Sequence, residues 1–341
     1  MLHFENDYNE GVHPILLEAI VSSNEEKLPG YGMDYYCESA KQKIRLACQC
    51  LEAEVEFLSG GTQTNQIVID SLLKPYEGVV SAETGHIAVH EAGAIEYTGH
   101  KVLTLPSYEG KVSAKDFEEL MTSFYDDENH NHMVFPGMLY ISQPTEYGTL
   151  YSKDELESLS RLCRHYDIPL FVDGARLGYG LAAKENTVSL PELADMVDVF
   201  YIGGTKMGAL IGEAVVFTKG NRPRNFSTIV KQHGALLAKG RLIGVQFDAF
   251  FTNNLYLSIG IEALERAEEL KTLLSEKGYQ FYLKSPTNQQ FVVMHNDDFK
   301  RLSQFVQMGF WEKYDAEHTI VRFATSWSTK PNYIEELSHI L

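Results

Sequence analysis

Residues 168–176 read IPLFVDGAR, an apolar run that ends in Asp173 and then turns through a glycine. Residues 197–206 read VDVFYIGGTK, a second apolar run that ends in a glycine-rich turn and Lys206. Short apolar runs separated by a helical segment are typical of parallel strands in an α/β protein. The carboxyl ends of such strands meet at one edge of the sheet, where ligands usually bind, so Asp173 and Lys206 are predicted to lie near a site.

The same alternation of strand and helix patterns extends from Val55 to Phe217. The predicted strands are Glu54–Leu58, Val79–Ala82, Lys101–Leu105, Met138–Ser142, Leu170–Asp173, Val197–Ile202 and Ala214–Thr218. Between them, apolar residues recur every three or four positions in the helical patterns Ala114–Phe124 and Lys153–Tyr166. The sequence therefore predicts the α/β class, with a large domain whose mostly parallel sheet is covered by helices.

The pattern changes after Asn221. Arg224–Lys277 predicts two long helices that break near residues 252–254. Beyond them we expect strands at Tyr279–Leu283, Gln290–Met294 and Thr319–Ala324, and helices at Phe299–Met308 and Pro331–Ile340. These elements predict a smaller α+β domain at the C-terminal end. We expect a large domain of residues 1–245 and a small one of residues 246–341.

The charge balance disfavours two classes of partner. Lys and Arg total 29 against 47 Asp and Glu, and the net charge of -18 repels nucleic acids and anionic membrane surfaces. No apolar run approaches the roughly 20 residues that span a bilayer. The first residues lack the basic leader and apolar stretch of a secretory signal, so we expect a cytoplasmic protein. Four cysteines form no CxxC pair or zinc-binding pattern, so we expect reduced thiols and no metal site.

Asp173 and Lys206 each have a structural interpretation beside the functional one. An aspartate after a strand is often a helix N-cap, and a lysine in a glycine-rich turn is usually solvated. Glycines and small apolar residues flank Lys206, however, and they favour a desolvated, reactive amine. A carboxylate and such an amine one strand-helix-strand unit apart favour the functional interpretation.

Two further segments can belong to the same site. Residues 57–66 read FLSGGTQTNQ, where Gly60, Gly61 and Thr62 join a strand to a helix whose N-terminus attracts anions. This predicts a phosphate-binding turn, although Gly-Gly-Thr alone is more often only a tight turn. His86 follows another predicted strand and is placed to lie over an aromatic ring or move protons, unless it is a core or capping histidine.

Together these residues resemble the threonine aldolases, a branch of the β-eliminating lyases among the pyridoxal-phosphate enzymes with the aspartate aminotransferase type of fold. The resemblance covers nearly the whole chain, and the Asp-Gly-Ala-Arg motif with the lysine is its most specific part. Its landmarks are Asn6-Asp7, Tyr31-Gly32-Met33-Asp34, Gly60-Gly61-Thr62, Asn65-Gln66, His86, Glu91-Ala92-Gly93-Ala94, Gln143-Pro144-Thr145, Asp173-Gly174-Ala175-Arg176, Thr205-Lys206, Arg241 and Arg322.

The resemblance implies a role for each landmark in binding pyridoxal 5'-phosphate. Lys206 forms the Schiff base, Asp173 pairs with the ring nitrogen and His86 stacks on the ring. The phosphate is bound by Gly60, Gly61 and Thr62, with Arg241 reaching it across a dimer interface. Thr145 contacts the edge of the ring, and Arg176 lies beside the phenolic oxygen or the acid group of the substrate.

The same resemblance implies a substrate and a reaction. Arg322 takes the carboxylate of an amino acid, with Asn6, Asp7 and Tyr31 beside it. The expected reaction cleaves a β-hydroxy-α-amino acid, of the threonine or allo-threonine type, to glycine and an aldehyde in a homodimer or homotetramer with shared sites. Other pyridoxal-phosphate reactions, such as β-elimination or transamination, remain alternatives, as does a protein that binds the cofactor without catalysis.

The chain departs from the family pattern at three places. Asn6-Asp7-Tyr8 stands where the family has Ser-Asp-Thr, and Gln143-Pro144-Thr145 where it has Glu-Asn-Thr. Met133 aligns with the histidine that helps hold the β-hydroxyl group, although His132 is adjacent to it. The acceptor of the hydroxyl proton is therefore left open among His86, His132 and a water molecule.

Overall fold

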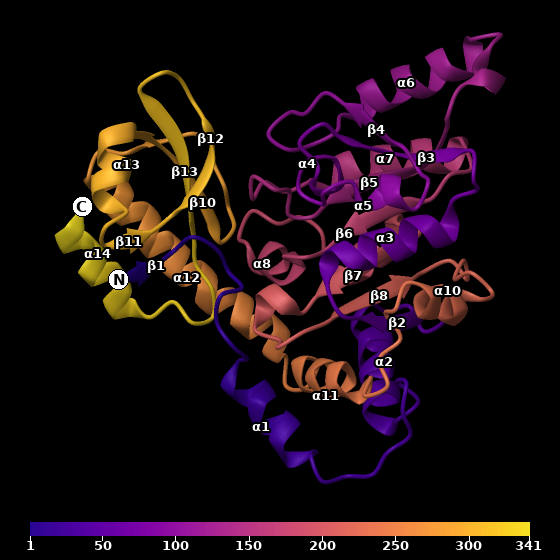
Figure 1. Cartoon of the computed structure of the whole chain (residues 1–341), viewed down its shortest axis with the longest axis horizontal. Coiled ribbons are helices and arrows are strands. Elements are labelled where there is room, and N and C mark those ends of the chain that lie inside the picture. Colours follow the sequence, from indigo (N-terminus) through magenta and orange to yellow (C-terminus); the bar gives the residue numbers. More distant parts are fainter.

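The computed structural model describes the whole chain, residues 1–341. Figure 1 shows a larger unit on the right and a smaller one on the left, with the long helix α12 (Leu255–Glu276) running between them. The division at residues 245 and 246 expected from the sequence stays a prediction. No helix combines the length and the apolar character that crossing a membrane requires. The four cysteines are unpaired, as expected.

The larger unit is built on a seven-stranded sheet with the order β2-β8-β7-β6-β5-β3-β4. Its strands are β2 (Glu54–Leu58), β3 (Glu77–Ala82), β4 (Val102–Leu105), β5 (Phe135–Ser142), β6 (Leu170–Asp173), β7 (Val199–Gly203) and β8 (Glu213–Phe217). Only β8 is antiparallel to its neighbours, so the predicted mostly parallel sheet is confirmed. The carboxyl ends of six strands and the first residue of β8 therefore share one edge.

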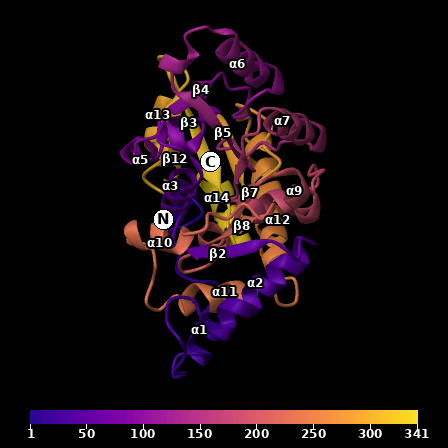
Figure 2. The ribbon, with the colours of Figure 1, turned by 90° about the vertical axis from the view of Figure 1, so that its right-hand side faces the viewer.

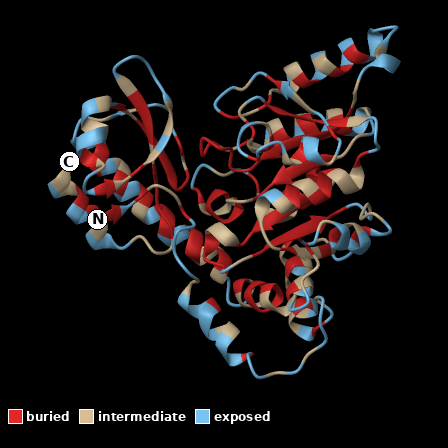
Figure 3. Cartoon of the chain, in the orientation of Figure 1, coloured by how far each residue is buried: buried red, intermediate tan, exposed pale blue.

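Both faces of this sheet are buried, which explains the nearly continuous apolar strands. On β5, Leu139 and Ile141 face one hydrophobic core and Met138 and Tyr140 face another. The helices that cover the sheet are α2 (Tyr35–Ala47), α3 (Gly61–Leu72), α6 (Ala114–Asp126), α7 (Lys153–His165), α9 (Leu190–Met196) and α10 (Phe226–Gln232). Figure 2 shows the sheet between α3 and α10 on one side and α7 and α9 on the other, and Figure 3 shows its strands as buried.

The smaller unit has a four-stranded antiparallel sheet with the order β12-β13-β10-β9. Its elements are β9 (Gln280–Phe281), β10 (Gln289–His295), α13 (Asn296–Leu302), β11 (Val306–Gln307), β12 (Gly309–Lys313), β13 (His318–Ala324) and α14 (Pro331–Ile340). The N-terminal strand β1 (Leu2–His3) pairs in parallel with β11. The first residues of the chain therefore lie with the C-terminal unit, which carries them towards the boundary between the two units.

Two expectations from the sequence are wrong. The helix expected at Phe299–Met308 ends at Leu302, because Val306–Gln307 pairs with β1 from the other end of the chain. The first of the two long helices is instead α10 and α11 (Arg241–Phe250), separated by a turn in which Gly234 has φ 70°. The predicted break at residues 252–254 is confirmed, since Asn253 and Asn254 both adopt positive φ.

Candidate active site

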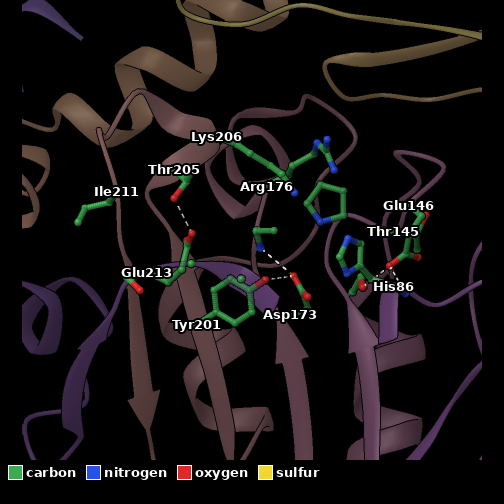
Figure 4. A pocket seen from close by; sticks show the side chains of 16 residues that line it. His86, Thr145, Glu146, Asp173, Arg176, Tyr201, Thr205, Lys206, Ile211 and Glu213 are labelled. Atoms are coloured by element: carbon green, nitrogen blue, oxygen red, sulfur yellow. Dashed lines mark hydrogen bonds between the residues drawn. The ribbon is translucent and has the colours of Figure 1, made fainter. Parts of the chain in front are cut away.

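A cavity of about 180 Å³ opens at the edge of the large sheet where the carboxyl ends of the parallel strands meet. Asp173, at the end of β6, and Lys206, after β7, both line it. Figure 4 shows these side chains with Arg176 and His86 around the same space. The two residues on which the sequence interpretation depends therefore face one cavity.

Asp173 is held at the base of this cavity by hydrogen bonds from other elements. Its Oδ2 accepts from the Tyr140 hydroxyl (2.6 Å) and from Asn65 Nδ2 (3.0 Å), and its Oδ1 accepts from the Tyr201 hydroxyl (2.5 Å). Burial by itself would raise the pKa of Asp173, but the charge of His86 and these donors hold that pKa below its ordinary value. A fixed negative charge therefore lies beneath the cavity.

Lys206 lies in the short helix η2 (Thr205–Met207) that follows β7. Its carbonyl oxygen accepts a hydrogen bond from the Tyr179 hydroxyl (2.7 Å), which fixes the backbone from which the side chain enters the cavity. Burial lowers the pKa of the Lys206 amine, and the positive charge of Arg176 lowers it further. Such an amine loses its proton more readily than a solvated lysine, as nucleophilic attack requires.

Arg176 precedes helix α8 (Leu177–Ala182) and is paired with Asp7 from the N-terminal segment. Its Nε lies 2.7 Å from Asp7 Oδ2 and its Nη2 lies 2.8 Å from Oδ1. Asn288 Nδ2 is a third donor to the same carboxylate, at 2.9 Å. Burial would raise the pKa of Asp7, but the charge and hydrogen bonds of Arg176 lower it to about 2. Asp7 therefore fixes Arg176, and its expected contact with a substrate stays a prediction.

The turn before α3 supplies backbone N–H groups to the cavity. Gly60 is the N-cap of α3 and provides no side chain to satisfy the first N–H groups of the helix. Gly60 and Gly61 line the cavity, and a Cβ atom on Gly61 would lie 3.2 Å from the Tyr201 hydroxyl. Glycine thus leaves room for an anion at the helix N-terminus. Thr62 is exposed and does not line the cavity, so its contact with a phosphate stays a prediction.

His86 begins the short helix α4 (His86–Val89) and lines the side of the cavity. Its Nδ1 lies 2.9 Å from Glu91 Oε1, which also accepts a hydrogen bond from Asn65 Nδ2 (2.9 Å). Because Asn65 also donates to Asp173, these four side chains form one polar network, in which Asn65, Glu91 and Asp173 are buried. The orientation of the imidazole ring is therefore fixed from beneath the site.

The loop after β5 closes the cavity beside His86. Glu146 Oε1 accepts hydrogen bonds from the backbone N–H of His86 (3.0 Å) and from the Ser142 hydroxyl (2.6 Å). Burial raises the pKa of this carboxyl group. Thr145 is buried at the cavity wall, where its hydroxyl pairs with that of Thr149 at 2.7 Å.

Arg322 lies on β13 at the boundary between the two units, outside the cavity lining. Its Nη2 donates to the carbonyl oxygen of Glu5 (2.6 Å) and its Nη1 to Gln289 Oε1 (3.2 Å). The guanidinium group lies over the Trp311 ring, 5.4 Å from its centre, and its Nε is buried without a partner. One N–H group of Arg322 is therefore left without a partner, and its expected contact with a substrate carboxylate stays a prediction.

The family follows from comparison with known proteins. The family model for beta-eliminating lyases matches residues 29–297. A solved structure of Leishmania major threonine aldolase superimposes with a TM-score of 0.95 at 38% identity, covering 100% of this chain and 99% of that one. The chain belongs to the threonine aldolases within the beta-eliminating lyases.

Other relatives of this threonine aldolase chain agree in sequence or fold. A low specificity L-threonine aldolase from a Pseudomonas strain is 28% identical over 343 residues, which cover 98% of this chain and 95% of that protein. The structure of a Thermus thermophilus aspartate aminotransferase double mutant has a TM-score of 0.69 at 15% identity, covering 100% of this chain and 92% of that one. This second likeness supports the aminotransferase type of fold.

Three further residues that the threonine aldolase resemblance singled out also lie outside the cavity of this chain. Tyr31 is 52% exposed, with the Lys231 amine 5.2 Å from the centre of its ring. Arg241 donates to the carbonyl oxygens of Glu26 (2.6 Å) and Asn24 (3.1 Å). The side chain of Asn6 accepts a hydrogen bond from the backbone of Tyr8. Their expected contacts with cofactor or substrate stay predictions.

His132 cannot act in the cavity of its own chain. It lies in η1 (His130–His132), before β5 begins, and both His132 and Met133 are exposed. The cavity lies at the other end of β5, about 25 Å away for a strand of this length. Within one chain of this threonine aldolase, His86 is therefore the histidine that lines the site.

Sequence reasoning gave no role to several side chains of the site, among them Tyr140, Tyr201, Glu146 and Glu213. Both tyrosines occur in buried strands, where an aromatic residue normally indicates only the core. Glu146 directly follows the landmark Gln143-Pro144-Thr145, but no role was assigned to it from the sequence. Glu213 carried a detectable signal, because it is a carboxylate at the start of the otherwise apolar strand β8.

Proposed function

We propose that this protein is a pyridoxal-phosphate-dependent aldolase that cleaves a β-hydroxy-α-amino acid, of the threonine or allo-threonine type, into glycine and an aldehyde. The observation that carries the proposal is the single cavity shared by Asp173 and Lys206 in a chain of the threonine aldolase family. The Pseudomonas relative, a low specificity L-threonine aldolase over 98% of this chain, supports the reaction class.

Pyridoxal 5'-phosphate is the cofactor of this family, and the residues of the cavity fit its three functional groups. An amine of lowered pKa suits its aldehyde, a buried carboxylate suits its ring nitrogen, and the open N-terminus of α3 suits its phosphate. When bound, this cofactor withdraws electrons from the α-carbon of an amino acid. The fit supports Lys206, Asp173, Gly60 and Gly61 as its binding residues.

Each side chain then has a task that its surroundings suit. Lys206 would hold the cofactor through its amine, and the negative charge of Asp173 would keep the ring nitrogen protonated. His86, fixed by Glu91, covers one face of the cavity. Arg176 and Arg322 are the two guanidinium groups available for the substrate carboxylate, and such groups bind carboxylates at two points. His86 or a water molecule accepts the hydroxyl proton.

The proposal includes a homodimer or homotetramer in the cytoplasm. Ile15, Leu17 and Val21 on helix α1 (Pro14–Ser22) are 49%, 48% and 64% exposed. Figure 1 shows α1 projecting from the lower side of the molecule, with no element of the chain beyond it. A second copy that covers this apolar helix would also bring Arg241 towards a neighbouring cavity, as the family resemblance implies.

A second reaction class has one observation in its favour. Met133 replaces the family histidine that holds the β-hydroxyl group, and His132 lies far from the cavity of its own chain. A site without that histidine is also suited to β-elimination or transamination, which need no contact with a β-hydroxyl group. The products distinguish these reactions, since they give ammonia or a keto acid in place of glycine and an aldehyde.

The test begins with the purified protein and pyridoxal 5'-phosphate. We expect a visible absorbance band that borohydride abolishes, with the label on Lys206, and no such band in Lys206→Ala. We then expect acetaldehyde from L-threonine or L-allo-threonine, or a larger aldehyde from phenylserine. If ammonia or a keto acid forms without an aldehyde, the reaction is β-elimination or transamination and not aldol cleavage. If the unmodified protein shows no such band, both the aldolase proposal and the second reaction class are contradicted.

A further inference from the structure

Glu213 lies between the two turns that flank the cavity. It is the first residue of β8, where it pairs with Leu58 of β2 on one side and with Gly203 of β7 on the other. Leu58 precedes the Gly60-Gly61 turn, and Gly203 precedes the turn that carries Lys206. Because β8 is antiparallel, its first residue lies at the same edge as the ends of those strands. The Glu213 side chain is 3% exposed and lines the cavity.

Both carboxylate oxygens of Glu213 bind the turn immediately before Lys206. Oε2 accepts a hydrogen bond from the backbone N–H of Gly204 (2.9 Å), and Oε1 accepts one from the Thr205 hydroxyl (2.7 Å). Tyr256 and Tyr179 donate to the carbonyl oxygens of Gly203 (2.8 Å) and Lys206 (2.7 Å). The Gly204 N–H also donates to the carbonyl oxygen of Gly212 (3.0 Å), so Glu213 shares this donor with the backbone. Glu213 is the side chain that binds the Thr205 hydroxyl and joins it to Gly204.

The charge of Glu213 also acts on the lysine. The charged and titratable groups that face these two side chains are Asp7, Asp173, Arg176, Tyr201 and Tyr256. Burial raises the pKa of Glu213 to about 7, against the hydrogen bonds from Thr205 and Gly204 and the charge of Lys206. Burial lowers the pKa of Lys206, and the charge of Glu213 opposes that effect. The charge of Glu213 and the charge of Lys206 therefore each raise the tendency of the other group to stay ionised.

We infer that Glu213 is a positioning residue for Lys206, which fixes the 204–206 turn and sets the charge around the lysine amine. The inference rests on the proposed function only in taking Lys206 as the lysine that binds the cofactor. Glu213 is assigned no contact with the cofactor or the substrate and acts through the turn and through its charge. A carboxylate that merely stabilised the strand edge would affect folding but would leave the titration of Lys206 unchanged.

The experiment measures how the amine titrates. The purified protein is mixed with pyridoxal 5'-phosphate at a series of pH values and reduced with borohydride, and the label on Lys206 is quantified by mass spectrometry. Glu213→Gln keeps the shape and removes the charge. We expect its half-maximal labelling to move to lower pH by about one unit, because the ammonium form loses a nearby negative charge. We also expect kcat to fall roughly tenfold with little change in KM.

Glu192→Gln is the matched control. Glu192 Oε2 also accepts a backbone N–H and a hydroxyl hydrogen bond, both from Ser189, at 2.8 and 2.6 Å. It is partly exposed on α9 and does not line the cavity. The pH dependence of Lys206 labelling in Glu192→Gln should coincide with that of the unmodified protein. If the curve of Glu213→Gln also coincides, while the thermal midpoint falls, Glu213 is only structural and the inference is wrong.

A second pair of variants tests the hydrogen bonds without removing the charge. Thr205→Val loses the bond to Glu213 Oε1, so we expect the labelling rate at high pH to fall severalfold at an unchanged midpoint. Thr205→Ser keeps a hydroxyl group and should restore the rate. Equal rates in all three proteins would overturn the inference even if Glu213→Gln does not fold. Failure of the unmodified protein to label Lys206 would instead contradict the proposed function.

Discussion

Asp7 and Arg176 form a two-point ion pair between the N-terminal segment and the start of α8, with N–O distances of 2.7 and 2.8 Å. The Asp7 side chain is fully buried and that of Arg176 is 11% exposed. Since β1 pairs with β11 in the smaller unit, this ion pair links the two units beside the cavity. The N-terminal residues therefore shape the site although they are far from it in sequence.

Asp7→Asn should destabilise the protein and leave Arg176 partly unpaired. Removing one partner of a buried ion pair typically costs about 3–5 kcal/mol, because the other charge stays buried. We expect the free energy of unfolding in urea to fall by about 3 kcal/mol or more. Glu119→Gln, which removes the exposed partner of Lys115, should cost less than about 0.5 kcal/mol. If the two variants lose the same free energy of unfolding, the buried Asp7 pair stabilises the protein no more than the exposed pair.

Acid should remove part of the stability through Asp7. Its pKa is lowered from 3.8 to about 2 in the folded chain, so the unfolded chain binds the proton first as pH falls. The contribution of Asp7 is therefore complete above about pH 4 and is lost as pH falls towards 2, by about 2 kcal/mol. Unfolding curves measured between pH 5 and about 2.5 should show this component in the unmodified protein. If the free energy of unfolding of Asp7→Asn falls equally steeply with pH, the loss of stability in acid comes from other carboxylates.

Asp173→Asn should keep the shape of the cavity floor but lose its charge. Without that charge the ring nitrogen of the cofactor is no longer held in its protonated form, and we expect kcat to fall roughly a hundredfold or more. Tyr201→Phe removes only one donor to the carboxylate, so its loss should be about tenfold. Steady-state kinetics with the preferred amino acid measures both. A larger loss in Tyr201→Phe than in Asp173→Asn would contradict this ordering.

Arg322→Lys should weaken substrate binding more than it slows the reaction. Lysine keeps the positive charge but loses the planar group that binds a carboxylate at two points. We expect KM to rise roughly tenfold or more, with a smaller change in kcat. Arg301→Lys, an exposed position paired with Asp298, serves as the control and should leave both parameters unchanged. An unchanged KM in Arg322→Lys would leave Arg176 as the group that binds the substrate carboxylate.

Much of the fold was predictable because its signals are local. Each strand of the large sheet appears as a short apolar run, since helices bury both of its faces, and the predicted strands match those observed to within a few residues. The helix wrongly predicted at Phe299–Met308 shows where prediction from local patterns fails. Val306 belongs to a strand only because Leu2, more than 300 residues away, pairs with it, and no local pattern carries that information.

The sequence by itself determined that a carboxylate at 173 and a lysine at 206 end neighbouring strands, since strand patterns and turn residues depend on nearby positions. Only the tertiary structure decided what surrounds them. Tyr140, Tyr201 and Asn65 converge on Asp173, and Glu213 on the turn before Lys206, because the sheet order and the crossing of helices bring distant residues together. Those partners set the charge and the proton affinity of the site, which are properties of a three-dimensional arrangement.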